Sequence, residues 1–327
     1  MQTTGSPTSN VGNFLTDVVE RLKIARYRFI VQPQEQIFLP EYKGSTFRGA
    51  FGTTFKKICC VRKQSVCSEC LLKDKCAYSF IFESSPSNSS EKLRNLEEIP
   101  RPFVIEPPLT EKNYFVPGDK LDFNLVLIGK AIEYLPYIVY TFIEMGKRGI
   151  GKNRGSFKVE KVINQKSEVI YDGKSEIINN NNSLVKIETP EKDIGNTLKL
   201  SFLTPTRIKY QGHYIDRPEF HIIIRSLLRR ISLLMYFYCG QELNIDFKNL
   251  ISQSENVKIS NIALRWVDWQ RYSSRQDTKM KLGGFVGDVM YAGDIKEFLP
   301  FLFLGECIHI GKNCTFGLGK YKIIGTR

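Results

Sequence analysis

Apolar and polar residues follow two different periods along this chain, and the periods change in the same order in each half. Alternation predicts strands at residues 24–32 (IARYRFIVQ) and 197–210 (TLKLSFLTPTRIKY). Helical spacing follows at residues 44–58 (GSTFRGAFGTTFKKI) and 217–238 (RPEFHIIIRSLLRRISLLMYFY). Further extended segments lie at 120–129 in the first half, and at 261–276 and 283–294 in the second.

A second helix and a final strand complete each half. Residues 133–137 (EYLPY) match residues 297–301 (EFLPF) in type at every position, and the proline suits the start of a helix. A loop containing IGKN follows both, at 150–153 and 310–313, and the strands 156–163 and 320–325 come next. The order is β-α-β-β-α-β in each half, which predicts an α+β protein with tandem ferredoxin-like (RRM-like) domains.

The same pattern predicts how the chain is divided. We expect a flexible N-terminal segment at residues 1–20, because it is polar, and a first ferredoxin-like domain at 21–195. A Cys-rich insertion at 59–78 interrupts that first domain. The second ferredoxin-like domain, with its Gly-rich loop, is expected at 196–327.

The two Gly/Lys loops are candidate phosphate contacts. Residues 146–152 fit G-x4-G-K, but Asn153 follows and the context is helix–loop–strand, so we exclude a P-loop and expect no nucleotide cofactor. Glycine allows close approach of the backbone to a phosphate, and Lys or Arg adds charge. The residues that could make these contacts are Lys147, Arg148, Lys152 and Arg154 in the first loop, and Lys312 and Lys320 in the second. The alternative is that the glycines only form tight turns.

The overall charge extends this interpretation. The chain has 47 Lys and Arg against 34 Asp and Glu, a formal net charge of +13, and 12% of its residues are aromatic. Such a balance favours a nucleic acid as partner. Other basic candidates are Lys43 and Arg48 in a stretch without acids, Arg225 and Arg229 on a helix face with His221, and Arg271 and Arg275 beside Trp269 and Tyr272. Together they favour single-stranded or hairpin RNA, although any one of them alone fits a solvated surface.

No apolar run approaches the length of about 18 residues that a membrane-spanning helix needs. The N-terminus MQTTGSPTSN has no apolar signal core. We therefore expect a cytoplasmic protein that does not bind a membrane.

Five of the eight cysteines lie between Cys59 and Cys76. In a chain without an export signal this clustering favours a metal site over disulfides. Cys67 and Cys70 have C-x2-C spacing, and Cys60 (or Cys59) with Cys76 completes a tetrahedral set for one structural Zn2+. An iron–sulfur cluster and unliganded thiols are the alternatives. Such a closed site would have no part in catalysis.

Several segments in order resemble the CRISPR-associated repeat-RNA processing endoribonucleases of the RAMP superfamily. They are KGSTFRGAFG, CSECLLKDKCAYSFIFE, RPFVIEPPL, GKRGIGKNRGSF, FLTPTRIKY, DWQRYSSRQ with GGFVG, and GECIHIGKNCTFGLGKY. The resemblance implies tandem ferredoxin-like domains that bind the CRISPR repeat RNA of a precursor transcript (pre-crRNA). It also implies one metal-independent transesterification per repeat, which leaves 2′,3′-cyclic phosphate and 5′-hydroxyl ends. Subunits of a CRISPR interference complex are further candidate partners.

Such a cut needs a base, an acid and a group that stabilises the phosphorane. The chain has three histidines, His213, His221 and His309, all in its second half. Many relatives place a catalytic histidine near the first helix, where this chain has Tyr42, Lys43, Ser45 and Arg48 instead. We prefer His309, beside the second loop, as acid or base, with Lys312, Lys320 or Lys152 on the phosphate; His221 and His213 are the next candidates.

Two other functions remain open at this point. One is a non-cleaving RAMP protein that retains guide RNA as a structural subunit, which the missing N-terminal histidine favours. The other is a different RNA-binding or RNA-modifying protein built on the same duplicated domain.

Overall fold

The computed structural model describes residues 18, 20–62, 66–83, 99–179, 183–187, 195–268, 270–273 and 278–325. They form two compact units, each described here by itself. The N-terminal unit contains Ile24–Val185 and Thr315–Gly317; the C-terminal unit contains Lys186–Cys314 and Leu318–Arg327, together with the described residues up to Lys23. The division falls earlier than the boundary predicted near residue 195. The predicted segment 1–20 lies almost entirely outside the described residues.

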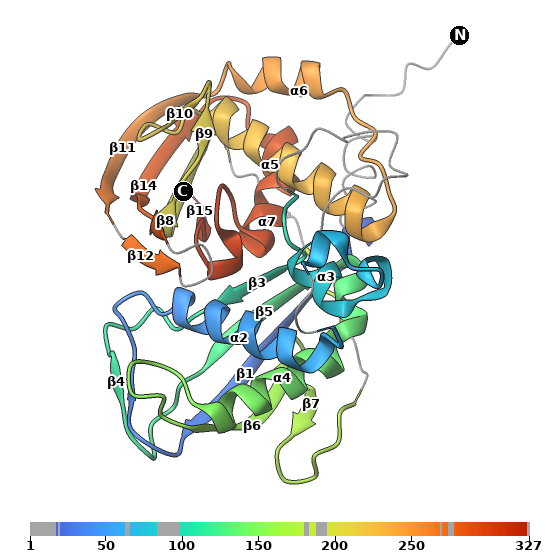
Figure 1. Cartoon of the computed structure of the whole chain (residues 1–327). Helices are drawn as coiled ribbons and strands as arrows, with labels where there is room; N and C mark the ends of the chain where they lie inside the picture. Colours follow the sequence, from blue (N-terminus) through green and yellow to red (C-terminus); the bar gives the residue numbers. More distant parts are fainter. Residues whose placement is uncertain are drawn as a thin grey trace. The chain divides into compact units, whose positions relative to one another are not determined.

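An antiparallel sheet of five strands forms the N-terminal unit, in the order β3-β5-β1-β6-β7. Two helices, α2 (Gly44–Cys59) and α4 (Leu135–Arg148), cover one face of this sheet (Figure 1). The strands are β1 (Ile24–Pro33), β3 (Phe103–Glu106), β5 (Phe123–Ile128), β6 (Phe157–Asn164) and β7 (Val169–Asp172). The short elements are β2 (Ile37–Phe38), β4 (Tyr114–Phe115), α3 (Ala77–Phe82) and the 3-10 helices η1 (Cys67–Glu69), η2 (Lys73–Lys75) and η3 (Gly129–Tyr134).

Helix α2 is held to the unit by its apolar face. Phe47, Phe51 and Phe55 recur at every fourth position and are fully buried. The ring of Phe51 stacks on Phe142 of α4, with centroids 4.9 Å apart. Burial of aromatic rings dominates the energetics of such cores, so this stripe orients α2 and α4 on the sheet.

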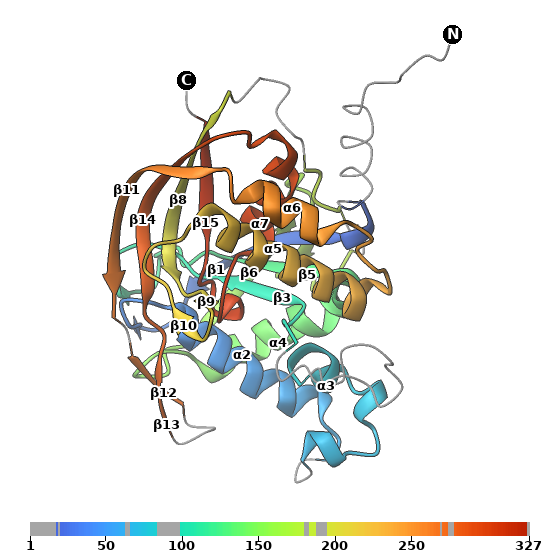
Figure 2. The ribbon, with the colours of Figure 1, turned by 90° about the horizontal axis from the view of Figure 1, so that it is seen from above.

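The C-terminal unit repeats the arrangement with four antiparallel strands in the order β11-β14-β8-β15. Its helices lie to one side of the sheet (Figure 2). The main strands are β8 (Thr197–Thr206), β11 (Lys258–Val267), β14 (Gly284–Ala292) and β15 (Tyr321–Gly325). The helices are α5 (Phe220–Leu234), which continues as the π-helix η4 (Met235–Cys239), α6 (Phe247–Ser254), α7 (Leu299–Ile308) and the 3-10 helix η5 (Lys296–Phe298). The 3-10 helix η6 (Cys314–Phe316) begins in this unit at Cys314, and its other two residues belong to the N-terminal unit. The ribbons are β9 (Lys209–Tyr210) with β10 (His213–Tyr214), and β12 (Gln270–Ser273) with β13 (Thr278–Lys281).

Both units therefore follow one topology. In each, the first strand lies between the third and the last strands of the βαββαβ order, and the second strand flanks the third. The prediction of tandem ferredoxin-like domains with a Cys-rich insertion in the first is confirmed. None of the described helices is both long and apolar enough to cross a bilayer.

Candidate nucleic-acid interface

The first Gly/Lys loop is fixed to strand β2 through its backbone. Helix α4 ends at Arg148, and Gly149 then adopts φ 74°. The amide of Lys152 donates to the carbonyl oxygen of Phe38 over 3.0 Å. A Cβ atom on Gly151 would lie only 2.2 Å from that same oxygen. Glycine is required here because two backbones approach closely.

Asn153 continues the attachment. Its side-chain oxygen accepts from the amide of Phe38 over 3.1 Å, and its side-chain amide donates to the carbonyl of Gln36. The amide of Ile150 donates to Gly155 over 2.9 Å, and that of Arg154 donates to Gly151 over 3.3 Å. The backbone amides of Ile150, Lys152 and Arg154 are therefore all bonded inside the protein.

The second loop repeats this attachment in the C-terminal unit. The amide of Lys312 donates to the carbonyl of Arg207 over 2.9 Å, and a Cβ on Gly311 would lie 2.5 Å from that oxygen. The amide of Ile310 donates to Gly319 over 3.0 Å. The repeated Ile-Gly-Lys sequence thus has the same backbone arrangement in both units.

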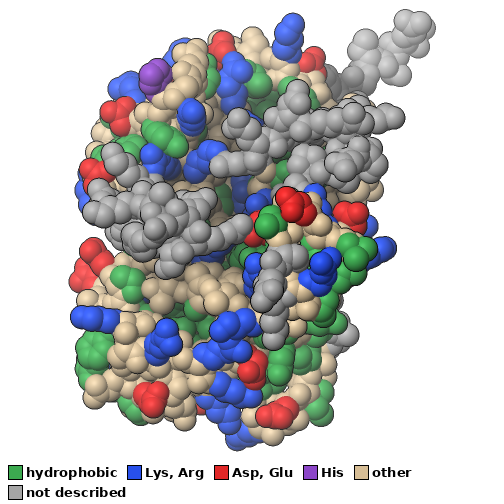
Figure 3. Space-filling model, in the orientation of Figure 1, with side chains coloured by type: hydrophobic (Ala, Val, Ile, Leu, Met, Phe, Trp, Pro, Cys, Tyr) green, Lys and Arg blue, Asp and Glu red, His purple; other side chains and the backbone are tan. Residues whose placement is uncertain are grey.

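Positive side chains remain at the surface of the first loop. Lys147, Arg148, Lys152 and Arg154 are all exposed at the C-terminal end of α4 and in the loop that follows. Lys147 forms an ion pair with Glu144 over 2.7 Å. Four of the predicted RNA-contact residues therefore lie exposed at the end of α4 and in the loop that follows it. Lys and Arg side chains are also spread over both units on the face seen in Figure 3.

Other predicted contact residues have structural roles in their surroundings. Lys43 is 1% exposed, and its ammonium donates to the carbonyls of Glu41 and Thr110 over 3.0 and 2.8 Å. Burial lowers the pKa of this lysine. The guanidinium of Arg48 lies 5.1 Å from the ring centroids of both Phe82 and Phe316. Burial of the Lys43 ammonium argues against the predicted contact with RNA.

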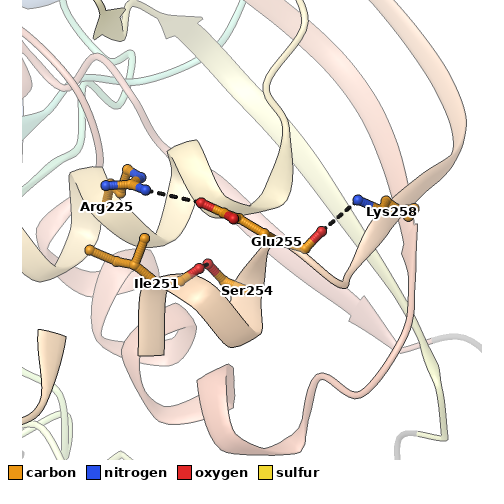
Figure 4. A network of polar contacts seen from close by, with 5 residues as sticks. All are labelled: Arg225, Ile251, Ser254, Glu255 and Lys258. Atoms are coloured by element: carbon orange, nitrogen blue, oxygen red, sulfur yellow. Dashed lines mark hydrogen bonds and ion pairs between the residues drawn. The ribbon is translucent and has the colours of Figure 1, made fainter. Parts of the chain in front are cut away.

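Arg225 forms part of a network between α5 and β11 (Figure 4). Its Nη2 lies 3.1 Å from Oε1 of Glu255, whose carbonyl accepts from Lys258 over 2.6 Å. Arg229, one helical turn further along α5, is exposed. Lys312 and Lys320 are half-buried. The side chains of Arg271 and Arg275 lie outside the described residues.

His309 is the residue whose placement differs most from its predicted role. It is 0% exposed, and its Nδ1 lies 3.0 Å from the carbonyl oxygen of Leu318. Its backbone has φ 64° and ψ 172°, the conformation that Gly149 has in the first unit. This region is almost restricted to glycine, so the fold imposes strain on His309. Burial argues against direct contact of its ring with RNA.

The other two histidines each lie next to Tyr210. His213 is exposed on β10 and is paired with Tyr210 of β9. The ring of His221 on α5 is 5.6 Å from the Tyr210 ring, edge to face. His221 Nδ1 is buried without a hydrogen-bond partner among the described residues. Burial and then the charge of Arg225 lower the pKa of His221, which favours its neutral, proton-accepting form.

The cysteines predicted to bind zinc lie in the insertion that follows helix α2. Cys60, Cys67, Cys70 and Cys76 are all half-buried. Within the described part of the chain, no three His, Cys, Asp or Glu side chains are placed to hold a metal ion. Burial, followed by the charges of Cys76 and Cys60, raises the pKa of the Cys59 thiol to about 11. The thiols of Cys59, Cys60, Cys67 and Cys76 are neighbours, and the zinc site stays a prediction.

Comparison with known proteins gives matches over most of the chain. Residues 200–321 match the family of the CRISPR-associated endoribonuclease Cas6, and residues 22–183 match a family described as an N-terminal domain. An uncharacterized protein of Archaeoglobus fulgidus is 24% identical over 297 residues, which are 88% of this chain and 93% of that protein.

Solved structures of Cas6 proteins have a similar fold over most of the chain. A Thermus thermophilus Cas6 superposes with a TM-score of 0.54 at 13% identity, covering 93% of this chain and 99% of that chain. A Cas6 product complex superposes with a TM-score of 0.54 at 15% sequence identity, covering 92% of this chain and 99% of that chain. A partial Cas6-RT-Cas1–Cas2 complex superposes with a TM-score of 0.56 at 12% sequence identity, covering 93% of this chain and 46% of that chain. At these identities the likeness shows the fold alone.

Proposed function

Because the chain belongs to the Cas6 family of CRISPR-associated endoribonucleases, we propose that it binds the repeat RNA of a CRISPR precursor transcript and cuts it once per repeat. The cut is a metal-independent transesterification that leaves a 2′,3′-cyclic phosphate and a 5′-hydroxyl. The observation that carries this proposal is the family match over residues 200–321, the part of the chain that contains all three histidines.

The most favourable proton-transfer groups are His213 and His221. Transfer of a proton from the 2′-hydroxyl and to the departing 5′-oxygen requires two positioned groups with pKa values near neutrality. His213 is exposed, His221 is half-buried, and both neighbour Tyr210. We propose that this pair supplies the acid and the base, in place of the buried His309. Lys312 and Lys152 are the candidates for contact with RNA phosphates.

The first test is incubation with the host's repeat RNA in excess EDTA, followed by mapping of both ends of the products. We expect a single cut with a cyclic phosphate. A requirement for a divalent ion, or random cleavage, would contradict the proposed reaction.

The second test concerns the acid and base. His213→Ala and His221→Ala should each slow cleavage by about 100- to 10,000-fold while RNA binding is retained. Tyr137→Leu, on the exposed face of α4, is the matched surface control. Wild-type cleavage by both histidine variants would remove the assignment and leave the overall function open.

A second function is favoured by one specific observation. All three histidines lie in the C-terminal unit, and the histidine preferred from the sequence is buried. A non-cleaving member of the family that retains guide RNA as a structural subunit would show this pattern. It predicts tight, salt-sensitive binding of repeat RNA without any product in the EDTA experiment.

A further inference from the structure

An exposed aromatic pair lies next to the first Gly/Lys loop. Strand β2 pairs with β4 so that Phe38 lies opposite Tyr114. Ile37 and Phe115 point inward and are buried, whereas Phe38 and Tyr114 are 44% and 38% exposed. Their rings are 4.6 Å apart at an angle of 32°. Hydrophobic side chains reach the surface at this edge of the unit, where β4 lies (Figures 1 and 3).

The C-terminal unit has a planar pair next to its own loop. The guanidinium of Arg207 lies 3.7 Å from the ring centroid of Tyr214, and Tyr214 is 45% exposed. The ribbon β9–β10 lies beside this pair, and the amide of Ile215 donates to the carbonyl oxygen of Ile208 over 3.1 Å. Ile208 is buried and anchors the ribbon, whereas Tyr214 is exposed and Arg207 is half-buried.

The two pairs occupy equivalent positions. In the N-terminal unit the carbonyl of Phe38 accepts the Lys152 amide, and in the C-terminal unit the carbonyl of Arg207 accepts the Lys312 amide. In each unit, therefore, the residue that anchors the loop backbone also contributes one plane of an exposed stack with a tyrosine. The cations of the loop are attached to the same backbone.

We infer that each pair is a stacking subsite for an unpaired RNA base, with the phosphates of the same strand lying along the adjacent loop. The inference rests on the proposed function and adds that each unit binds an unpaired base of the RNA. Every base has a flat π face that stacks on aromatic rings or on a guanidinium plane, independently of sequence. The lysines beside each pair supply the complementary charge.

Packing alone is a weaker explanation. A cross-strand pair that only stabilises a ribbon needs apolar contact, and Phe38 with Tyr114 would meet that need. The pair of Arg207 and Tyr214 does not meet it in the same way, because one of its two planes is a charged guanidinium. The property common to both is a flat, half-exposed surface beside a basic loop, which is what a nucleobase requires.

The test measures binding of two fluorescent single strands, the host's repeat RNA and an oligouridylate, to Phe38→Leu and Tyr214→Leu. Leucine keeps apolar volume and removes the plane. We expect affinity to fall by about 5- to 150-fold for each variant. The slope of affinity against salt concentration should stay unchanged, because the phosphate contacts remain. Tyr137→Leu, 54% exposed on α4, is the matched control and should bind as wild type does.

A direct readout covers the case in which a variant folds poorly. Phe38→Trp keeps the plane, so it should bind RNA as wild type does, and its added emission should be quenched when a base stacks on it. Quenching by both strands supports the inference. Unchanged emission, together with affinities of both leucine variants within twofold of wild type, overturns it even when wild type cuts repeat RNA.

The same experiment separates the inference from the proposed function. If wild type binds oligouridylate, the leucine variants bind it more weakly, and repeat RNA is neither preferred nor cut, the stacking subsites stand and the repeat-processing function falls. If wild type binds neither strand, both fall.

Discussion

Gly149 and His309 show how one backbone position accepts two very different residues. Both follow the last residue of a helix, with φ of 74° and 64°. Glycine adopts this conformation freely, whereas a residue with a Cβ is strained there. In the C-terminal unit burial of the ring and its contact with Leu318 hold the histidine in place. The residue that follows the helix therefore serves the backbone conformation of the loop in both units.

The loop glycines should be intolerant of even a methyl group. Gly151→Ala should destabilise the protein strongly, because its Cβ would lie 2.2 Å from the carbonyl oxygen of Phe38. Gly212→Ala is the matched control: Gly212 also has positive φ, but a Cβ there meets nothing within 4 Å. The control should lose only about 1–2 kcal/mol of unfolding free energy. Denaturant unfolding of both variants measures the difference, and equal losses would contradict the role of close approach.

Protonation of His221 should weaken the folded state. Burial and Arg225 lower its pKa in the folded protein below the value of about 6.5 in the unfolded chain. As the pH falls below about 6.5, the unfolded chain takes up a proton before the folded one does, so stability decreases. Unfolding free energies measured at pH 7.5 and 5.5 should show this decrease for wild type and a smaller one for His221→Gln. His213→Gln, at an exposed histidine, is the control; an unchanged pH dependence in the His221 variant would refute the claim.

The limits of prediction from the sequence are clearest at these residues. The duplicated Ile-Gly-Lys letters predicted a duplicated loop, because glycine and its neighbours determine local backbone conformation. They did not reveal that the loop amides bond to Phe38 and Arg207, since those partners are remote in sequence and lie in two-residue strands and turns. The burial of His309 was equally inaccessible, because a neighbour in sequence to a loop need not point into it.

At the scale of elements, long periodic segments were predicted well and short ones were not. The helices α2, α4, α5 and α7 and the strands β1, β6 and β8 all lie where the pattern placed them. Strand β3 was missed because four continuously buried residues carry no alternation. The strands β2, β4 and β10 were missed, and β9 was merged with β8 into one predicted strand at 197–210, because two residues are too few for a period.

The Cys-rich insertion carries a prediction of its own. We propose that it binds about one zinc ion per chain, with Cys60, Cys67, Cys70 and Cys76 drawn together by the metal, because C-x2-C thiolates favour Zn2+. Metal analysis of purified protein should find it, and chelation should lower the melting temperature. Cys239→Ser, outside the insertion, is the control for loss of a single thiol. Protein without zinc, and with unchanged melting after chelation, would show that these thiols serve only packing.

At the scale of the whole molecule, the charge of +13 predicts binding that weakens steeply with salt. For single strands the slope of log affinity against log salt is about −0.7 per phosphate neutralised. Lys152→Ala and Arg154→Ala should each reduce the magnitude of that slope by about 0.7 if both contact phosphates. Lys166→Ala is the matched control, because Lys166 is equally exposed but lies away from the loop in sequence. An identical slope for all three variants would exclude the loop from the phosphate path.

The bonds from Lys152 to Phe38 and from Lys312 to Arg207 have a consequence for the motions of each unit. Both amides lie in loops, where exchange of amide hydrogen with deuterium is ordinarily fast, yet each is bonded to a carbonyl outside its own loop. Each hydrogen can exchange only when its loop leaves the neighbouring segment. The rate of deuterium uptake at the amides of Lys152 and Lys312 therefore reports how often each loop detaches from its neighbouring segment. The two rates can be measured separately in the same chain.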